Sequence, residues 1–284
     1  MIRLTALMLT FASMGFAQDP PPAPPSEPPE PVQEVPDDEQ QPPEDQAQTA
    51  RARVDEILAD QERVGQHLRG VGCQVEYSDT DELNLSTTRR EGFVKYLRTG
   101  GNPLFWIEFH KQVTDDMVAE SRIWYVFNGS SLLEARERDR AMIERQVVSA
   151  GQTLDLFDLD TAPFPMPFGQ KRDEILKHFE VKLVPPKPAD PENTDHLVCT
   201  PREGSPLARR YERLEFFVLR DLHLPRRILS IENGGYRTVV ANFPDLSAES
   251  LRQKLTPQDF AEPAAWKKYA RTVEKFENES SLKP

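Results

Sequence analysis

Alternation of apolar and polar residues with a period of two runs through most of the chain after Cys73. The runs CQVEY, LNLSTTRREGFVKYLR, PLFWIEFHKQ and SRIWYVFNGSSLLEARE alternate or carry β-branched and aromatic residues, as half-buried strands do. Turn signals separate them: DTD at 79–81, GGNP at 100–103 and NG at 128–129. Because each run follows the previous one after a short connection, the pattern predicts an antiparallel meander.

A second block of strands follows a less regular stretch. Residues 132–148, LLEARERDRAMIERQVV, are compatible with a helix or a hairpin, and the thin apolar stripe at helical spacing favours a hairpin that turns near Asp139. The later runs are FEVKLVP, DHLVCTP, YERLEFFVL, RRILSI and YRTVVANF. The Asn-Gly pair of ENGG at 232–235 suits a tight turn between the last two. The absence of βαβ alternation argues against a doubly wound nucleotide-binding fold.

Helical spacing occurs in three places. Residues 49–69 carry an amphipathic pattern that predicts a first helix ending at Gly70 or Gly72. QKRDEILKHF at 170–179 predicts a short helix after the loop PFPMPFG. Trp266, Tyr269, Val273 and Phe276 predict a terminal helix over Pro263–Glu279. The sum is an α+β domain: a large curved antiparallel sheet with helices on one face.

The first 48 residues have the composition of an export signal and a tether. Residues 1–17 combine Arg3 with a short apolar run and the triplet Gly15-Phe16-Ala17, which predicts a signal peptide cleaved near Ala17 and a periplasmic protein. An uncleaved anchor is the lesser alternative. Residues 18–48 hold 11 of the 26 prolines and too few apolar residues to form a core, so they predict a disordered Pro/Glu-rich tether. It serves as an inert spacer or, less favoured, as a docking site.

The charge of the body excludes some function classes. The tether holds nine acidic and no basic residues, so residues from Thr49 onward carry only −4 of the net −12. A nearly balanced body without a basic stripe argues against nucleic-acid binding. The five histidines show no metal-ligand spacing, and HExxH, CxxC and G-x-S-x-G are absent from the sequence. We therefore expect no enzyme, no metal and no cofactor.

Two cysteines, Cys73 and Cys199, lie far apart in a chain expected to be exported. An oxidising compartment makes a disulfide between them plausible. A pair of free, buried thiols is equally compatible, because the sequence does not place their Cα atoms within bridging range.

The order of these features resembles the LolA-like family of periplasmic outer-membrane lipoprotein carriers and lipoprotein-sorting proteins. After the first helix come GFVKYL at 92–97 and NPLFW at 102–106, then WYVFNGSSLL at 124–133, PF at 167–168, LVCTP at 197–201, and a hairpin from Leu224-Pro225 to Phe243. The resemblance covers residues 53–262. The chain departs from the family pattern at Asn102, where the family has arginine, and at Leu133, where it has an aromatic residue.

The resemblance implies a half-open antiparallel β-barrel whose concave face is covered by helices and receives acyl chains. It implies a lipid-binding domain at 49–262 and a non-enzymatic carrier in outer-membrane lipoprotein sorting. The C-terminal helix and tail expected at 263–284 lie outside the resemblance. The carrier's partners would be lipid or lipoprotein acyl chains and the inner- and outer-membrane sorting proteins, and we expect a monomer. The alternative is a cell-envelope interaction or sensor module of the same fold without lipid cargo. An envelope hydrolase ranks last.

Ten apolar residues are the candidates for the ligand-binding lining. Along one strand, Phe105, Ile107 and Phe109 share one face, and Leu104 and Trp106 the other. We expect one of these sets to line the cavity, with help from Trp124, Val126, Phe168, Phe216 and Val218. The competing interpretation is that all of them are ordinary core.

Overall fold

The computed structural model describes residues 44–148, 170–232 and 234–274. The predicted leader, nearly all of the tether and the loop with Phe168 lie outside the described residues. The helices are α1 (Glu44–His67), α2 (Arg172–His178) and α3 (Ala248–Arg252), with 3-10 turns η1 (Pro206–Arg209), η2 (Pro257–Phe260) and η3 (Ala264–Lys268). The strands are β1 (Gly70–Asp81), β2 (Ser86–Leu97), β3 (Leu104–Thr114), β4 (Met117–Ala119), β5 (Ile123–Phe127), β6 (Ser131–Arg136), β7 (Ala141–Gln146), β8 (Phe179–Val184), β9 (Thr194–Pro201), β10 (Tyr211–Leu219), β11 (Pro225–Glu232), β12 (Arg237–Asn242) and β13 (Ala270–Glu274).

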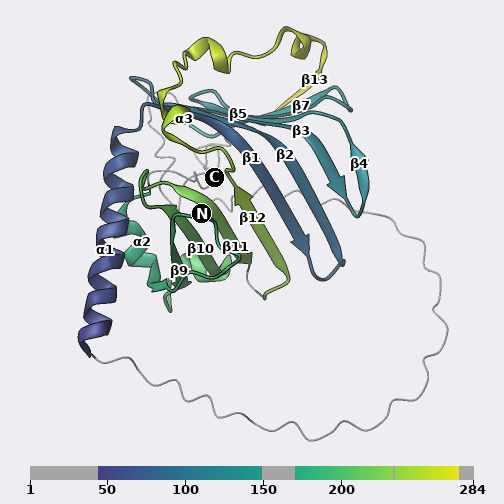
Figure 1. Ribbon diagram of the computed structural model, residues 1–284. Helices are drawn as coiled ribbons and strands as arrows, with labels where there is room; N and C mark the ends of the chain where they lie inside the picture. Colours follow the sequence, from purple (N-terminus) through teal and green to yellow (C-terminus); the bar gives the residue numbers. More distant parts are fainter. Residues whose placement is uncertain (1–43, 149–169, 233, 275–284) are drawn as a thin grey trace, which may run out of the picture.

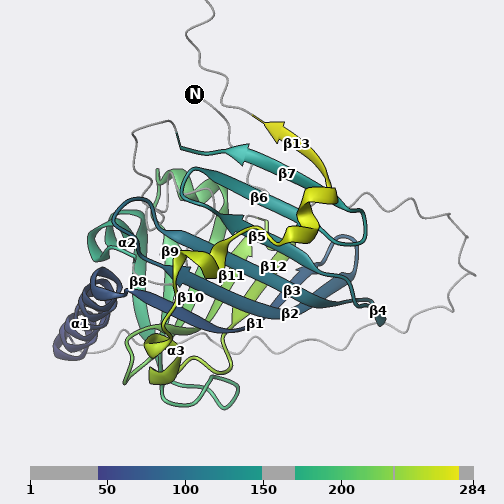
Figure 2. The ribbon, with the colours of Figure 1, turned by 90° about the horizontal axis from the view of Figure 1, so that it is seen from above.

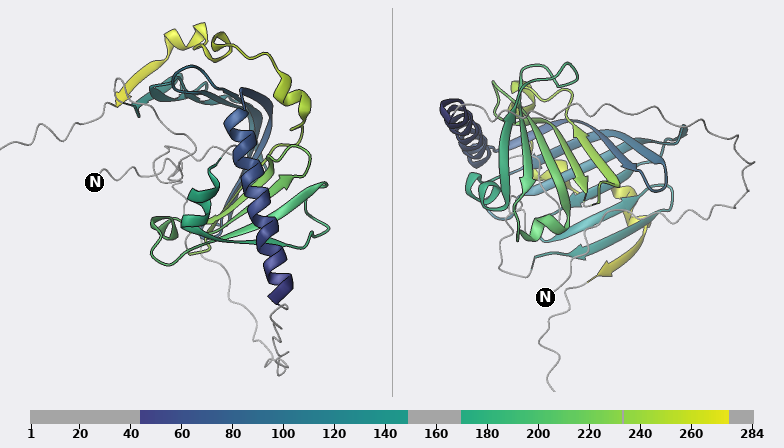
Figure 3. Two further views of the ribbon diagram at one scale, coloured as in Figure 1. Left: turned by 90° about the vertical axis from the view of Figure 1, so that its left-hand side faces the viewer. Right: turned by 90° about the horizontal axis from the view of Figure 1, so that it is seen from below.

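All of these strands belong to one curled sheet. Their order is β13-β7-β6-β5-β3-β2-β1-β12-β11-β10-β9-β8, with β4 paired to β3. The sheet curls so that its N-terminal half, β1–β7 with β13, lies opposite its C-terminal half, β8–β12 (Figure 1; Figure 3, left). The end strands β13 and β8 do not pair with each other among the described strands, so the barrel stays open. The predicted fold class, an α+β half-open antiparallel barrel, is confirmed.

Several predicted elements are present as expected. The first helix is α1, although it begins at Glu44, inside the predicted tether, and not at Thr49. β1 begins at Gly70, where the sequence places a helix end. The ambiguous stretch 132–148 is the hairpin β6–β7, which turns through residues 137–140. Short connections produce antiparallel neighbours throughout β1–β3 and β5–β7.

The helix predicted over Pro263–Glu279 is wrong for the described residues. The chain makes the short 3-10 turn η3 and then β13, which pairs in parallel with β7. A single turn already accounts for the spacing of Trp266 and Tyr269, and the amide of Ala270 then donates to the carbonyl of Arg140 at 2.8 Å. Residues 253–274, here named the C-terminal strap, cross the outer face of the N-terminal half (Figure 2).

Helices cover the inner face of the C-terminal half. The apolar side of α1, with Val54, Ile57 and Leu58, is buried against β9 and β10, and α2 adds Ile175 to the same cluster. This side of α1 is what its helical periodicity predicts. No helix among the described residues is both long enough and apolar enough to cross a membrane.

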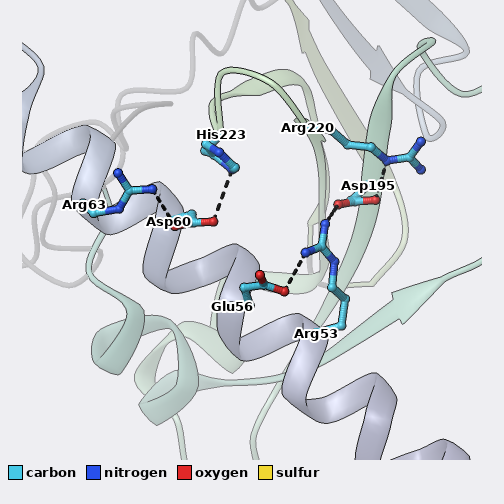
Figure 4. A network of polar contacts seen from close by, with 7 residues as sticks. All are labelled: Arg53, Glu56, Asp60, Arg63, Asp195, Arg220 and His223. Atoms are coloured by element: carbon cyan, nitrogen blue, oxygen red, sulfur yellow. Dashed lines mark hydrogen bonds and ion pairs between the residues drawn. The ribbon is translucent and has the colours of Figure 1, made fainter.

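Ion pairs fix α1 to the ends of strands from the C-terminal half (Figure 4). Arg53 of α1 donates to Asp195 of β9 at 2.9 Å, and Arg220 donates to the other oxygen of Asp195 at 2.8 Å. Two helical turns further, Asp60 lies 3.5 Å from the ring of His223 in the turn between β10 and β11. Because the contacts of α1 join residues more than a hundred positions apart, they set the position of the helix on the sheet.

A β-bulge in β3 lies opposite a glycine of β2. Glu91 pairs with Lys111 and Gly92 with Phe109, so His110 is the extra residue. A Cβ atom at Gly92 would overlap the carbonyl of Glu108 on the neighbouring strand. The bulge bends the two strands and increases their twist, which helps the sheet to curl.

Candidate functional site on the inward face of the sheet

The inward face of the N-terminal half is made of cross-strand rows. Alternate residues of β1, β2, β3, β5 and β6 point into the barrel, and paired residues stand side by side. The first three rows are Val71, Tyr96, Phe105, Phe127 and Leu132; then Cys73, Val94, Ile107, Tyr125 and Glu134; then Val75, Gly92, Phe109, Ile123 and Arg136. The fourth is Tyr77, Arg90 and Gln112, and the fifth is Asp79, Thr88 and Thr114.

The side chains become less buried from the first row towards the later rows. The first row is a closed core, in which Phe105 is 2% and Phe127 0% exposed. Ile107, Tyr125 and Ile123, further along, are only half-buried, as are Ile228 and Ala241 from β11 and β12. The inward face is therefore packed at one end and becomes accessible towards the tips of the β1–β2 and β11–β12 hairpins.

The structure separates the ten predicted lining residues. Phe105, Ile107 and Phe109 point inward on the N-terminal half. Phe216 and Val218 point inward on the C-terminal half, under α1. Leu104, Trp106, Trp124 and Val126 belong to a cluster on the outer face, and Phe168 lies outside the described residues. The predicted set therefore does not form one surface, and the role of its inward members in ligand binding stays a prediction.

The outward members lie under the C-terminal strap. Trp266 of the strap stacks on Trp106, with ring centroids 5.7 Å apart and an interplanar angle of 6°. It meets Trp124 edge to face at 5.4 Å, and Phe260 closes the cluster. These are all three tryptophans of the chain. The part of the outer face around Trp106 and Trp124 is thus covered by the chain's own residues.

Charged side chains occur at two levels of the inward face, a buried group around Glu134 in the second row and an ion pair of Asp79 in the fifth. Glu134, 3% exposed, accepts from Arg136 at 2.6 Å and lies 3.5 Å from Arg145. Asp79 accepts two hydrogen bonds from Arg237, at 2.8 and 2.6 Å, and these bonds raise the pKa of that guanidinium. The inward face therefore changes from apolar to polar along its strands.

Arg90 is the residue of this face that the sequence interpretation missed. It is 7% exposed, and its Nε donates to Oε1 of Gln112 at 2.9 Å. In the sequence it looks like part of a polar stretch, between Arg89 and Glu91. A signal was nevertheless present, because Arg90 is in phase with the buried Val94 and Tyr96 of the same strand.

A separate pocket of about 290 Å³ lies at the β8–β9 edge of the sheet. His196 lines it, and its Nε2 is 2.8 Å from Oε2 of Glu215. The described residues contain no group of three or more His, Cys, Asp or Glu side chains that could hold a metal ion. This pocket shares no residue with the predicted lining.

Both cysteines are free and buried. Cys73 lies in the inward core of β1, and Cys199 lies under α1 on β9. Burial raises the pKa of the Cys73 thiol to about 12 and also raises that of Cys199. Of the two alternatives left open by the sequence, the structure has the pair of free thiols.

We expect both thiols to resist iodoacetamide in the folded protein at pH 8 and to react fully in denaturant, because only the thiolate attacks. Intact-mass measurement with and without urea checks this. Because the folded state holds the Cys73 proton more tightly, this thiol's contribution to stability is present below pH 9 and is lost as the pH rises towards 12. Rapid alkylation of folded protein at pH 8 would contradict the burial of these side chains.

Comparison with known proteins finds likeness at the level of the fold. No protein-family model and no curated protein sequence matches the chain. Among solved structures, an uncharacterized conserved protein of Thermus thermophilus aligns with 78% of this chain and 99% of its own, at 12% identity and a TM-score of 0.47. The Pseudomonas aeruginosa MucA/MucB complex aligns with 71% of this chain and 61% of its own, at 14% identity and a TM-score of 0.35. A LolA superfamily protein of Nitrosomonas europaea aligns with 74% of this chain and 97% of its own, at 12% identity and a TM-score of 0.32.

A LolA superfamily protein is thus among the solved structures to which the chain is similar. At such low identities and TM-scores, the matches give no information about the ligands or partners of this chain.

Proposed function

We propose that the protein is a non-enzymatic, exported binding protein that holds an acyl chain against the accessible half of its inward face. The observation that carries the proposal is the gradient along the strands, from a closed apolar core to a half-buried apolar surface and then to a polar end. Each CH₂ group moved from water onto such a surface contributes about 0.8 kcal/mol. A carrier of this kind needs apolar area, and needs no catalytic group.

The half-buried residues define where the chain would lie. Ile107 and Tyr125 from one half of the sheet pack against the same core cluster as Ile228 and Ala241 from the other half. These four and Ile123 are all partly accessible. The first row, in contrast, is filled by the protein itself. Binding would therefore extend the existing core towards the hairpin tips.

A neutral probe tests the proposal. The full chain, freed of lipid, should bind a fluorescent long-chain acyl probe that hexadecan-1-ol displaces. Ile107→Asn should weaken the binding of the alcohol by about 10-fold, because it places an amide in the apolar path. Leu104→Asn, on the outer face of the same strand, is the matched control and should leave the affinity unchanged. Failure of every acyl probe to bind would refute the carrier.

A second candidate, an envelope interaction module, is favoured by one specific observation. Neighbouring hairpin tips carry exposed apolar side chains: Leu83 is 68%, Leu85 87%, Met117 73% and Tyr236 54% exposed. Backbone contacts join the tips, since the Glu82 amide donates to the carbonyl of Tyr236 at 2.8 Å. Exposed apolar groups collected in this way are typical of a contact surface.

We propose a protein partner in the envelope for this surface. Crosslinking in cells should lose the partner when Leu83, Leu85 and Met117 are replaced by serine, while acyl binding persists. If the same variant instead loses acyl binding and keeps its crosslinks, the tips belong to the carrier site and the module is refuted.

A further inference from the structure

On β1, β2 and β3, the fourth row of the inward face marks the boundary between its apolar and polar parts. On β2, the inward side chains run Tyr96, Val94, Gly92, Arg90 and Thr88. The neighbouring strands make the same change at the same level, since Tyr77 on β1 and Gln112 on β3 pair with Arg90. An amphiphile whose tail lies against the third row would place its head at this fourth row.

Arg90 is held rigidly at that boundary. Its guanidinium lies over two aromatic rings, with its central carbon 5.7 Å from the ring centre of Tyr77 and 5.9 Å from that of Phe109. The hydrogen bond from Nε to Gln112 fixes the plane of the group. The two terminal nitrogens of Arg90 make no hydrogen bond or ion pair with any described residue. They form the two-pronged donor that matches a carboxylate.

The carboxylates near Arg90 already form ion pairs with other arginines. Glu134 is engaged by Arg136 and Arg145, and Asp79 by Arg237. Among the described residues no carboxylate pairs with Arg90, although this residue is only 7% exposed. Its terminal nitrogens are not among the fully buried polar atoms of the described residues, so a ligand can reach them. Arg90 is thus a positive charge on this face without a counter-ion from the described part of the chain.

A second polar group on this face lacks a partner. The hydroxyl of Tyr125 is buried and makes no hydrogen bond within the described part of the chain. Its ring meets that of Phe109 edge to face, with centroids 6.4 Å apart. Tyr125 therefore stands beside the aromatic pair that holds Arg90, and its hydroxyl can donate to an anion.

We propose that Arg90, assisted by the hydroxyl of Tyr125, binds the carboxylate of a long-chain monocarboxylic acid whose tail lies along Ile107 and Ile123. This inference rests on the proposed function and names its ligand class. One uncompensated guanidinium matches one negative charge. A phosphate dianion would need a second cation, and the neighbouring arginines are committed to their own carboxylates.

The test compares three ligands that differ only in their heads. Hexadecanoic acid, hexadecan-1-ol and hexadecyl phosphate compete for a fluorescent acyl probe on the full chain freed of lipid. We expect the acid to bind about 10- to 100-fold more tightly than the alcohol, which is the value of a charge-assisted hydrogen-bond pair. Arg90→Gln should remove this preference and leave the alcohol unchanged, and Tyr125→Phe should reduce it by about 5-fold.

Matched variants separate the charge from the fold. Arg89→Gln changes the adjacent, exposed arginine on the outer face and should keep the preference for the acid. Arg90→Lys keeps the charge but loses the two-pronged donor, so it should fall between the wild type and Arg90→Gln. If Arg90→Gln does not fold, the wild-type comparison of acid and alcohol together with Arg90→Lys still decides the question.

The outcomes are distinct. Equal affinity for acid and alcohol in the wild type overturns the role of Arg90 and leaves the carrier standing. Tighter binding of hexadecyl phosphate than of the acid overturns the head-group assignment. Failure of all three ligands to compete refutes the carrier itself, and the inference with it.

Discussion

Replacing Trp266 by alanine is expected to lower the free energy of unfolding by about 3 kcal/mol, the lower end of the range for a buried tryptophan. The side chain is 2% exposed and touches both other tryptophans. Its loss would open a cavity between the strap and the sheet. The effect stays at the lower end because the indole N–H groups of Trp266 and Trp106 are buried without an acceptor among the described residues, which is itself unfavourable.

Urea unfolding followed by tryptophan fluorescence and by far-UV circular dichroism measures this effect. Lys267→Ala, at the adjacent exposed position, is the control and should change stability by less than about 0.5 kcal/mol. The near-UV signal of the stacked pair should also disappear in Trp266→Ala. Retention of both stability and this signal would mean that the strap is not docked in solution.

Glu134→Gln should destabilise the protein by about 3 kcal/mol. The side chain is 2% exposed, and its carboxylate is the shared partner of Arg136 and Arg145. The amide keeps the shape of the side chain but removes the negative charge, so Arg136 and Arg145 lose a shared, buried anionic partner.

Glu91→Gln provides the matched comparison. Glu91 forms an ion pair with Lys111 across neighbouring strands, at 2.7 Å, with half of its side chain exposed. Exposed pairs of this kind contribute about 0–1 kcal/mol. Thermal and urea unfolding of the two variants should therefore differ clearly. Equal losses would show that burial does not decide the energetics of the Glu134 cluster.

Local pattern predicted most of the sheet, and the exception has a physical reason. Alternation, the Asn128-Gly129 turn and the turn near Asp139 each depend on neighbouring residues, so they are readable from the sequence. The pairing of Ala270–Glu274 with Ala141–Gln146 is not local, since it joins segments about 130 residues apart. Helical spacing around Trp266 was the only signal available there, and tertiary pairing overrode it.

The candidate site was predictable in part. Strand periodicity correctly divided residues 104–109 between two faces, but it could not say which face is covered by the strap. Trp124 and Val126 were grouped with the inward lining because they are apolar. The pairing of their strand with residues 104–109, which puts them on the outer face, is not visible in the sequence. Arg90 was overlooked for the opposite reason. Because it is charged, it was assigned to the solvent, although it lies on the same face of its strand as the buried Val94 and Tyr96.

The parallel pairing of β13 with β7 also determines what the edge of the sheet presents to other molecules. β13 is exposed along its length and is fastened by its charges, with Arg271 2.8 Å from Glu144 and Glu274 2.7 Å from Arg145. Without it, β7 would offer unpaired backbone groups beside Met142 and Ile143 to strands of other molecules. A detached strap would therefore expose β7 as a new sheet edge, and we expect such a molecule to self-associate more readily than the docked form.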